Sequence, residues 1–308
     1  MPTPALRKIL PLYLLLLSGC TISSFYMPPG LYSADARVLE TAGRMGFHGI
    51  DESSAMEKSG KFADTFWTLN DSGGGPRIFA IRSTGEIIKP DWVQNYRGIQ
   101  VDKAVNIDWE DMATDGQGNI YIADFGNNDS LRRNLGIYIL AEPDPKSTVK
   151  TAVAAKIPFR YPDQLAFPPA KRDFDAEALF WARDHLYVLT KHRSDTLSKL
   201  YRFDTLDPAG DNIPALVDSF DAGGMVTAAD ASDDGSLLAI LTYHDIWLIE
   251  LPATGSALLQ GRRYRLPIRL RQCEGICFAD DRLLISNERG VIYSVSLQEI
   301  QRHRVQGN

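Results

Sequence analysis

Five acidic residues recur along the chain in the same local sequence context, and such residues can bind a cation or act as general bases. In each copy an acid and small or apolar residues lead to a turn, a run of β-forming residues and a polar end. The fullest copy is 106–128, NIDWEDMATDGQGNIYIADFGNN, whose acidic cluster is Asp108, Glu110 and Asp111. The matched acids of the five copies are Glu52, Glu110, Glu177, Asp230 and Glu274.

Carboxylate oxygens are hard ligands, and Ca²⁺ binds about 6 to 8 such oxygens at a time. Carboxylates that are crowded together raise one another's pKa unless a cation or hydrogen-bond donors lie between them. If the five acids meet in space, we expect one of two arrangements. Either they hold a cation, with Ca²⁺ the best fit, or they accept hydrogen bonds from the backbone of the neighbouring repeat and lock the repeats together.

Polar residues also recur where the expected second strand of each repeat ends, and they extend the candidate site. The candidate ligand-binding residues are Asn70, Asp71, Asn127, Asn128, Arg132, Lys191, Tyr243 and Glu288. The candidate metal ligands are Glu52, Glu110, Asp124, Glu177 and Glu274. Glu110 and Glu177 are the candidate bases for an attacking water. Any one of these residues alone is equally consistent with a solvated loop, so the prediction depends on their recurrence at matched positions.

Several other chemistries are not supported by the sequence. It has no G-x-S-x-G motif, and His192 and His244 stand alone in separate repeats, which argues against a serine hydrolase. It has no P-loop or G-x-G-x-x-G motif. The acidic turns at 115–119 and 233–235 lack the spacing of an EF-hand loop.

The spacing of the repeats predicts the fold. Successive matched acids lie 58, 67, 53 and 44 residues apart, and a β-propeller blade takes about 40 to 50 residues. We therefore expect an all-β chain that forms a single propeller at 36–297, with five four-stranded blades or, as the alternative, six. The segment 36–47 should supply the missing outer strand of the last blade, and 298–308 should form a C-terminal tail. Because inner strands line a propeller's central channel, the matched acids should converge there.

The first residues have the pattern of an export signal. Arg7 and Lys8 precede a Leu-rich run that is too short to span a bilayer. The following residues 17–20, LSGC, resemble the lipobox of bacterial lipoproteins. This resemblance implies cleavage of a signal peptide at 1–19, lipid modification of Cys20 and a lipidated tether at 20–35. The alternative is an ordinary secretory signal followed by a chance cysteine.

Anchoring through Cys20 would place the protein in the bacterial cell envelope. Several acyl chains hold a protein stably on a membrane. Thr21 stands where a signal for retention in the inner membrane would have Asp, so the expected location is the outer membrane, facing the periplasm. In a Gram-positive host the corresponding location is the cell surface.

The net charge of the chain argues against one class of partner. The 308 residues carry a net charge of −6, which becomes −8 once Arg7 and Lys8 are removed, and this sign disfavours nucleic acid as a partner.

Cys273 and Cys277 remain in the mature chain. Four residues of a strand span about 13 Å, which is too far for a disulfide, so we expect two buried thiols.

A set of motifs resembles a family of uncharacterised bacterial exported proteins whose propeller is related to the calcium-requiring phytase-like and lactonase-like propellers. The motifs are NDSGGG, NIDWEDMA, NIYIADFGNN, DAEAL, LYVLTK, VTAADASDDG and EGICF, and the resemblance covers about 49–295. It implies a propeller with a polar site on its channel face. It points to Asn70, Asp71, Glu110, Asp124, Asn127, Asn128, Glu177, Lys191 and Glu288. Asp230 and Phe125 depart from a complete cage of metal ligands.

Two functions are consistent with these observations. The first is a lipid-anchored envelope propeller that binds an envelope protein or a small anionic ligand on its channel face, around a calcium ion. The alternative is a calcium-assisted hydrolase of a phosphoester or lactone, in which Glu110 or Glu177 activates water. Fold alone cannot decide between them, because propellers host many unrelated functions.

Overall fold

A computed structural model of the chain describes residues 32–255 and 257–305. The expected signal peptide, Cys20 and most of the expected tether lie outside these residues. Within the described residues, none of the helices has both the length and the apolar character needed to cross a bilayer.

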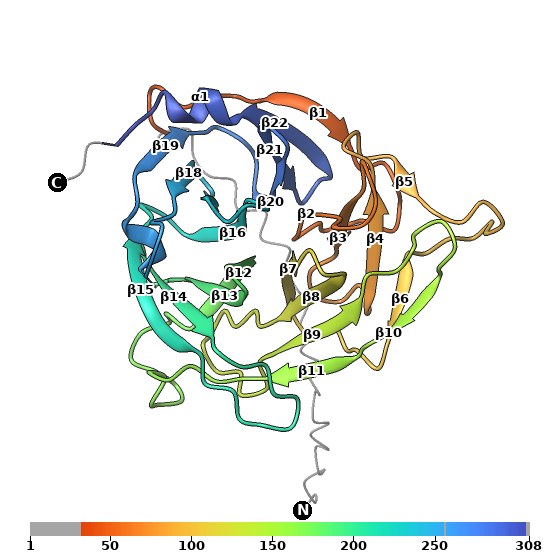
Figure 1. Cartoon of the computed structure of the whole chain (residues 1–308), viewed down its shortest axis with the longest axis horizontal. Coiled ribbons are helices and arrows are strands. Elements are labelled where there is room, and N and C mark those ends of the chain that lie inside the picture. The colour runs from red at the N-terminus through yellow and green to blue at the C-terminus, as the bar shows by residue number, and fades with distance from the viewer. Residues whose placement is uncertain (1–31, 256, 306–308) are drawn as a thin grey trace, which may run out of the picture. The chain divides into compact units, whose positions relative to one another are not determined.

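The described residues form five sheets arranged around a common centre, and all their strand pairs are antiparallel except β10 (Lys150–Ala152) with β6 (Ile99–Asp102) (Figure 1). We number these sheets as blades one to five in chain order, and each begins with its innermost strand. Blade two consists of β7 (Trp109–Thr114), β8 (Asn119–Asp124), β9 (Gly136–Ala141) and β11 (Ala155–Pro158). Blade three consists of β12 (Asp175–Ala182), β13 (His185–Lys191), β14 (Leu197–Phe203) and β15 (Ala215–Asp221). Blade four consists of β16 (Val226–Ala231), β17 (Leu237–Thr242), β18 (Asp245–Glu250) and β19 (Arg263–Pro267).

The first blade is larger than the others. Its strands, from the centre outward, are β2 (Glu57–Lys58), β3 (Phe66–Leu69), β4 (Arg77–Ile81) and β6 (Ile99–Asp102). Two further strands extend it: β5 (Ile87–Ile88) pairs with β4, and β10 (Lys150–Ala152) runs parallel to β6. Outside the five sheets, the described residues contain a 3₁₀ helix, η2 (Leu258–Gln260), and a short α-helix, α1 (Leu297–Gln301).

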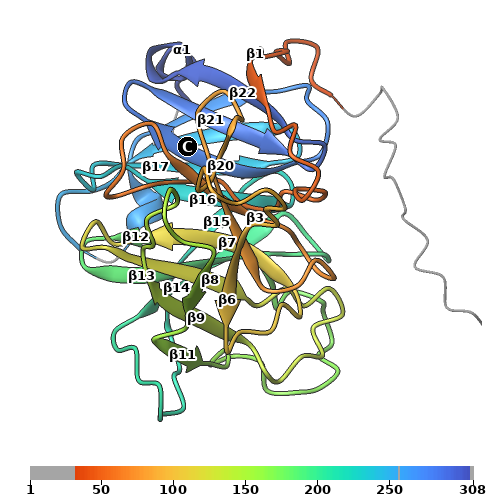
Figure 2. The same cartoon turned by 90° about the vertical axis from the view of Figure 1, so that its right-hand side faces the viewer.

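The ring is closed by a strand from the N-terminal side of the domain. Blade five contains β20 (Cys273–Ala279), β21 (Arg282–Asn287) and β22 (Val291–Ser296), and its outer strand is β1 (Glu40–Arg44). Figure 2 shows β1 beside β22. The predicted five-bladed all-β propeller and its closure by a strand from 36–47 are therefore confirmed, and the six-bladed alternative is wrong.

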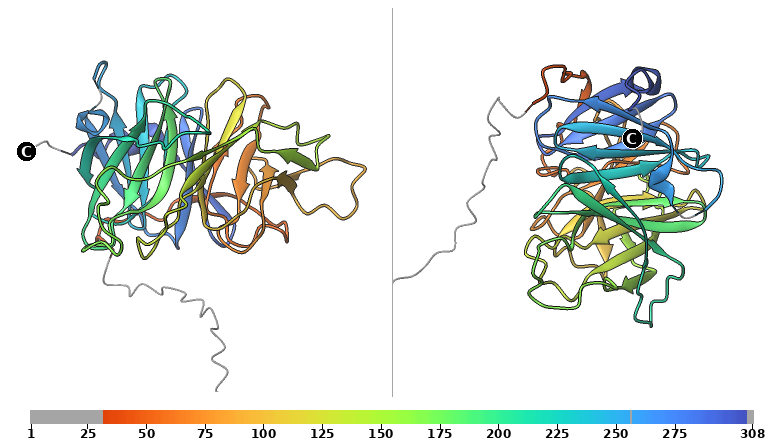
Figure 3. Two further views of the ribbon diagram at one scale, coloured as in Figure 1. Left: turned by 90° about the horizontal axis from the view of Figure 1, so that it is seen from below. Right: turned by 90° about the vertical axis from the view of Figure 1, so that its left-hand side faces the viewer.

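The inner strands are apolar on both faces because each sheet packs against a sheet on either side (Figure 3). In β8, Ile120 and Ile122 pack in a core shared with blade one, whereas Tyr121 and Ala123 pack in a core shared with blade three. Successive side chains of a strand point to opposite faces, so a strand between two cores needs apolar residues at nearly every position. This requirement explains why the sequence shows β-rich runs more clearly than strict alternation.

Closure of the ring brings blades five and one into close contact at Gly275. A Cβ atom on Gly275 would lie 2.8 Å from both the Ala55 carbonyl carbon and the Met56 nitrogen, which is closer than backbone atoms allow. Cys277, two residues along β20, is buried in the core between these blades. Cys273 and Cys277 are both free and buried, as predicted, and burial raises the pKa of each thiol.

Gly275→Ala should destabilise the protein, because the added methyl group meets backbone that cannot move without opening the joint between blades one and five. Overpacking of this kind costs about 1–3 kcal/mol, and we expect a fall of this size in the free energy of unfolding measured by chemical denaturation. Gly46→Ala is the matched control, since a Cβ there meets nothing within 4 Å. Equal stability of the two variants would contradict this account of ring closure.

Candidate functional site on the channel face

Each inner strand has a bulge near its start. This bulge determines which side chains lie at the end of the channel where the inner strands begin, which we call the upper end. The pairing register shifts after Trp109 in β7, after Ala176 in β12, after Val226 in β16 and after Cys273 in β20. Blade one shows the same shift between the Ser53 bridge and Glu57. A bulge adds one residue that has no partner on the neighbouring strand. The residues that follow the last pair before the bulge are Ser54, Glu110, Glu177, Thr227 and Glu274.

The predicted ring of five matched acids is therefore wrong at two positions. Glu52 precedes the bulge position of its blade by two residues, and Asp230 follows that of its blade by three. The equivalent residues carry hydroxyl groups that bind the next blade. Ser54 Oγ donates to the Trp109 carbonyl at 3.2 Å, and Thr227 Oγ1 donates to the Cys273 carbonyl at 2.8 Å.

Two acids that lie further along the inner strands, Asp230 and Glu57, accept hydrogen bonds from the backbone of the neighbouring blade. This is one of the two arrangements expected for the matched acids. Asp230 Oδ2 accepts from the Phe278 N–H of blade five at 2.8 Å. Glu57, which the sequence comparison missed, accepts from both the N–H and the hydroxyl of Thr114 in blade two, at 2.8 and 2.7 Å. Burial raises the pKa of both carboxyls, to about 7 for Asp230 and well above the ordinary value for Glu57.

Asp111 occupies the centre of the ring. Its Oδ2 accepts from the Leu179 N–H of blade three at 2.9 Å, and the N–H of Ala229 in blade four also stabilises its charge. Asp111 is 2% exposed, and burial raises its pKa well above the ordinary value. The other four blades place small buried residues at this level: Ala55, Ala178, Ala228 and Gly275. Asp111 therefore links the inner strands of blades two, three and four.

Above the hub, three acids from two blades form a cluster. One carboxylate oxygen from each of Asp71, Asp108 and Glu110 lies within 4.8 Å of the others. Asp71 follows β3, whereas Asp108 and Glu110 lie on either side of Trp109 at the start of β7. Gly126 allows the loop after β8 to approach, because a Cβ there would clash with the carboxyl groups of Glu110 and Asp108. The structure therefore unites the predicted Asp71 and Glu110 and adds Asp108, which the sequence marked only by its proximity to Glu110.

Glu110 differs from the other buried acids because, among the described residues, its carboxylate has no hydrogen-bond donor and no ion-pair partner within bonding distance. Its residue is only 6% exposed. Burial raises its pKa well above the ordinary value, and the charges of Glu177, Asp71 and Asp108 raise it further. Burial likewise raises the pKa of Asp71 to about 7, and it raises that of Asp108 despite the opposing charge of Arg132. This is the electrostatic pattern of crowded carboxylates that lack a counter-ion.

The other predicted acids of the upper ring already have partners. Glu177 Oε1 lies 2.7 Å from Lys191 Nζ, and Lys191 donates to the Tyr243 hydroxyl at 3.0 Å. Tyr243 donates in turn to Glu274 Oε1 at 3.2 Å. Gln272, which was not predicted, donates to Glu274 at 3.0 Å and also to Glu288. Glu177, Lys191, Tyr243, Glu274 and Glu288 thus form one continuous polar chain across blades three, four and five.

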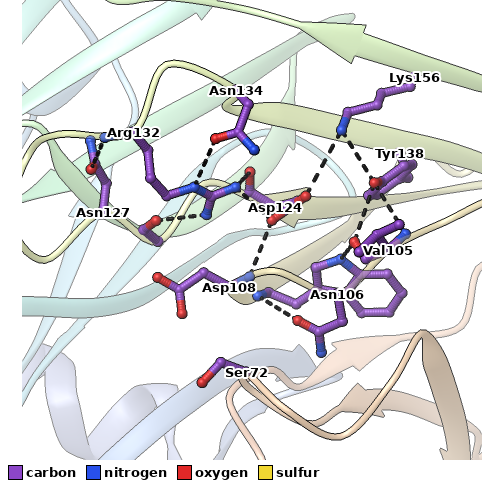
Figure 4. A network of polar contacts seen from close by, with 12 residues as sticks. Ser72, Val105, Asn106, Asp108, Asp124, Asn127, Arg132, Asn134, Tyr138 and Lys156 are labelled. Atoms are coloured by element: carbon purple, nitrogen blue, oxygen red, sulfur yellow. Dashed lines mark hydrogen bonds and ion pairs between the residues drawn. The ribbon is translucent and has the colours of Figure 1, made fainter. Parts of the chain in front are cut away.

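Asp124 is committed to structural contacts (Figure 4). It is fully buried, and its Oδ1 accepts from Arg132 at 2.9 Å and from the Asp108 N–H at 3.2 Å. Figure 4 shows Asp108 between this pair and Ser72. Asp124 therefore positions Asp108 for the cluster, and its own Oδ1 is not free to bind a metal.

The side chains of the three predicted asparagines also form hydrogen bonds within and between loops. Asn70 accepts from the Asp51 N–H and donates to the Gly49 carbonyl. Asn127 donates to the Phe174 carbonyl at 3.0 Å and accepts from the Arg132 N–H at 2.8 Å. Asn128 accepts from Arg193, which also pairs with Asp175 at 2.7 Å. Glu52 is exposed, and its charge adds to the rise in the pKa of Asp71 and Glu288, which places it on the rim of the cluster.

A second group of ligand-type residues, Asp173, His192 and Asp195, lies at the end of β13. His192 Nδ1 is 2.7 Å from Asp195 Oδ1, and Asp173 accepts from the Ser194 hydroxyl at 2.6 Å. The atoms that could bind a metal are therefore engaged in hydrogen bonds within the group. We interpret the group as one that stabilises the loop after β13.

Comparison with known proteins identifies no family for this chain. No family model matches it, and no curated protein matches its sequence. Among solved structures, a nidogen/laminin complex aligns with a TM-score of 0.42 at 12% identity, over 83% of this chain and 80% of that one. A β-propeller domain of Cps50 (Swd1) from Myceliophteria thermophila aligns with a TM-score of 0.39 at 14% identity, over 80% of this chain and 65% of that one.

The crowded carboxyls predict how stability depends on pH when divalent cations are removed. The pKa is about 7 for Asp71 and Glu288 and about 8 for Glu177, all above their ordinary values. Between about pH 5 and 8 the folded state therefore holds more protons than the unfolded state, and the free energy of unfolding falls as pH rises. The lowered pKa of His244 acts in the opposite direction, but it is a single group.

Chemical denaturation in EDTA at a series of pH values measures this dependence. A free energy of unfolding that rises from pH 5 to pH 8 would contradict it.

Proposed function

We propose that this protein is a ligand-binding β-propeller whose channel face holds a divalent cation between Asp71, Asp108 and Glu110. The observation that carries the proposal is Glu110, a buried carboxylate that has no partner among the described residues and faces two further acids. An unpaired buried charge is costly, and a cation would remove that cost.

The donor set fits Ca²⁺ best. All three side chains offer carboxylate oxygens, and neither His nor Cys takes part in the cluster. Glu52 on the rim could add a fourth carboxylate. Three or four carboxylates leave part of a calcium coordination shell for water or for oxygens of a ligand. The proposed ligand is accordingly a small anion or an acidic group of a partner protein, bound at the end of the channel where the cluster lies.

The proposed location is the bacterial cell envelope, with the propeller anchored through lipid on Cys20. This part rests on the sequence 17–20 alone, since these residues lie outside the described part of the chain. Metabolic labelling with a fatty acid should mark the protein, and Cys20→Ala should abolish the label. Label that persists in the variant would contradict lipidation of Cys20.

A thermal melt with and without Ca²⁺ tests the cation site. At a free Ca²⁺ concentration of about 100 times Kd, binding stabilises the folded state by about 2.7 kcal/mol, which raises Tm by several degrees over the value in EDTA. Glu110→Gln should remove most of this rise. In EDTA the same variant should melt at or above the wild-type temperature, because it removes an uncompensated charge.

Glu86→Gln serves as the control, because Glu86 is exposed and makes only a 3.9 Å contact with Arg82, far from the cluster. It should keep the full calcium response. A wild-type protein whose Tm is the same in Ca²⁺ and in EDTA would overturn the cation site.

The second candidate function is calcium-assisted hydrolysis of a phosphoester or lactone. It is favoured by the pKa of about 7 for Asp71, which suits a carboxylate that must take a proton from water near neutral pH. Glu177, one of the two predicted bases, is held by Lys191 at 2.7 Å, so Asp71 and Glu110 are the better candidates.

Turnover of phosphoester and lactone panels by the calcium-loaded protein separates the two functions. Hydrolysis that is lost in Asp71→Asn and retained in Glu86→Gln would establish the second, and calcium binding without turnover would leave the first.

A further inference from the structure

A basic cavity lies in blade five, on the same face as the acid cluster. Its volume is about 440 Å³. Three of its lining residues are arginines, and none is acidic: the polar lining residues are Thr41, Arg44, Arg271, Asn287, Arg289 and Tyr293. This composition is unusual for a chain whose net charge is −6.

Closure of the ring builds this cavity from segments that are far apart in the sequence. Arg44 ends β1, Arg289 lies in the turn between β21 and β22, and Arg271 lies two residues before the start of β20. Arg44 pairs with Val291 in the register of β1 and β22, and its Nη1 donates to the Arg289 carbonyl at 3.1 Å. Figure 1 shows β1 alongside β22 at this part of the ring. The arginines therefore converge only when the propeller closes.

None of the three guanidinium groups has a carboxylate partner among the described residues. Arg132, Arg193 and Arg265, in comparison, each form an ion pair at 2.9 Å or less. The nearest acid in sequence, Glu288, is turned away toward the channel, where Gln272 binds it and where Glu274, Glu52 and Asp71 raise its pKa. All three arginines are exposed, so water solvates them, and an anion that contacts several of them at once would replace this water with charge-assisted hydrogen bonds.

The cavity also offers oriented neutral groups. Asn287 is only 1% exposed, and its Oδ1 accepts from the Val291 N–H at 2.9 Å, which fixes its side chain. Its Nδ2 lies 3.5 Å from the Tyr293 hydroxyl. The hydroxyls of Tyr293 and Thr41 can therefore complete a shell of donors around an anion.

A second cavity shows that a cluster of arginines alone does not indicate an anion site. It measures about 180 Å³ and is lined by Arg132, Arg133 and Arg160. There, however, Arg132 pairs with Asp124 at 2.9 Å and Arg160 with Asp211 at 2.9 Å. Arg133 stacks on Phe167, with its guanidinium carbon 3.9 Å from the ring centre. Those arginines are already paired or stacked within the fold, whereas in blade five only Arg44 makes a side-chain hydrogen bond, to the Arg289 carbonyl, and none of the three has a carboxylate partner among the described residues.

We propose that the blade-five cavity binds a phosphomonoester, with Arg44, Arg271 and Arg289 binding the phosphate group. Arginine presents a planar fork of donors that matches phosphate oxygens, and three such groups suit a doubly charged head better than a single carboxylate. The volume lies within the range of about 300–1,000 Å³ that is typical of small-molecule sites, so it also has room for an organic moiety. The site needs no cation and is independent of the acid cluster.

Isothermal titration of the full-length protein in EDTA tests this site, with glucose 6-phosphate as the probe and glucose as its neutral counterpart. We expect glucose 6-phosphate to bind and glucose not to bind. Arg271→Gln and Arg289→Gln should each weaken binding at least tenfold, which corresponds to about 1.4 kcal/mol. Inorganic phosphate and sulfate, titrated in parallel, show whether the head group alone is recognised.

Arg282→Gln is the matched control. Arg282 lies at the opposite end of β21 and pairs with the exposed Asp281 at 3.4 Å, so its loss should leave the affinity unchanged. Glu110→Gln should also bind glucose 6-phosphate normally, which separates this result from the fate of the cation site. Absence of binding, equal binding of glucose, or equal losses in Arg271→Gln and Arg282→Gln would overturn the proposal.

Discussion

The hydrogen bonds of the Asp111 carboxylate are the interaction on which the centre of this propeller depends. One acidic side chain from blade two reaches backbone N–H groups of blades three and four, and the remaining blades leave room for it with alanine or glycine. A buried carboxylate is tolerable only when donors satisfy it, and here those donors belong to inner strands whose edges would otherwise be unpaired. The same contact joins three blades at the inner strands that surround the channel.

The same residue types serve two purposes at two depths of the ring. Glu57, Asp111 and Asp230 lie deep, accept backbone hydrogen bonds from neighbouring blades, and hold the ring together. Higher up, Glu177 and Glu274 are balanced by Lys191, Tyr243 and Gln272, whereas Glu110 faces Asp71 and Asp108 without compensation among the described residues. Perturbed carboxyls of this kind cluster at functional sites, which is why the cation site is placed at Glu110 and its two neighbours.

The sequence predicted the fold well because blade number and closure depend on repeat spacing and on β-rich runs that are visible without coordinates. The sequence predicted the site less well because the bulge in each inner strand shifts the pairing register by one residue. No residue pattern in the sequence marks the position of that bulge. Asp230 follows small residues and precedes a tight turn, like the other acids, yet Thr227 holds the equivalent position. Asn127 and Asn128 stand at matched loop positions, but their amides are taken by backbone and by Arg193. Asp108 was missed as a ligand because only the folded loop after β8 shows that it faces Glu110.

The arrangement of charge around blade five depends on neighbouring residues that face different groups at the ends of its strands. Arg271 lines the basic cavity, whereas its neighbour Gln272 reaches Glu274 and Glu288 on the channel side. Glu288 likewise lies near the acids of the channel side, whereas its neighbour Arg289 lines the basic cavity. Neighbouring residues at this edge of the sheet therefore face different groups, which keeps the arginines apart from acids that would otherwise pair with them. The separation keeps the acid cluster and the basic cavity from neutralising one another, which both proposals require.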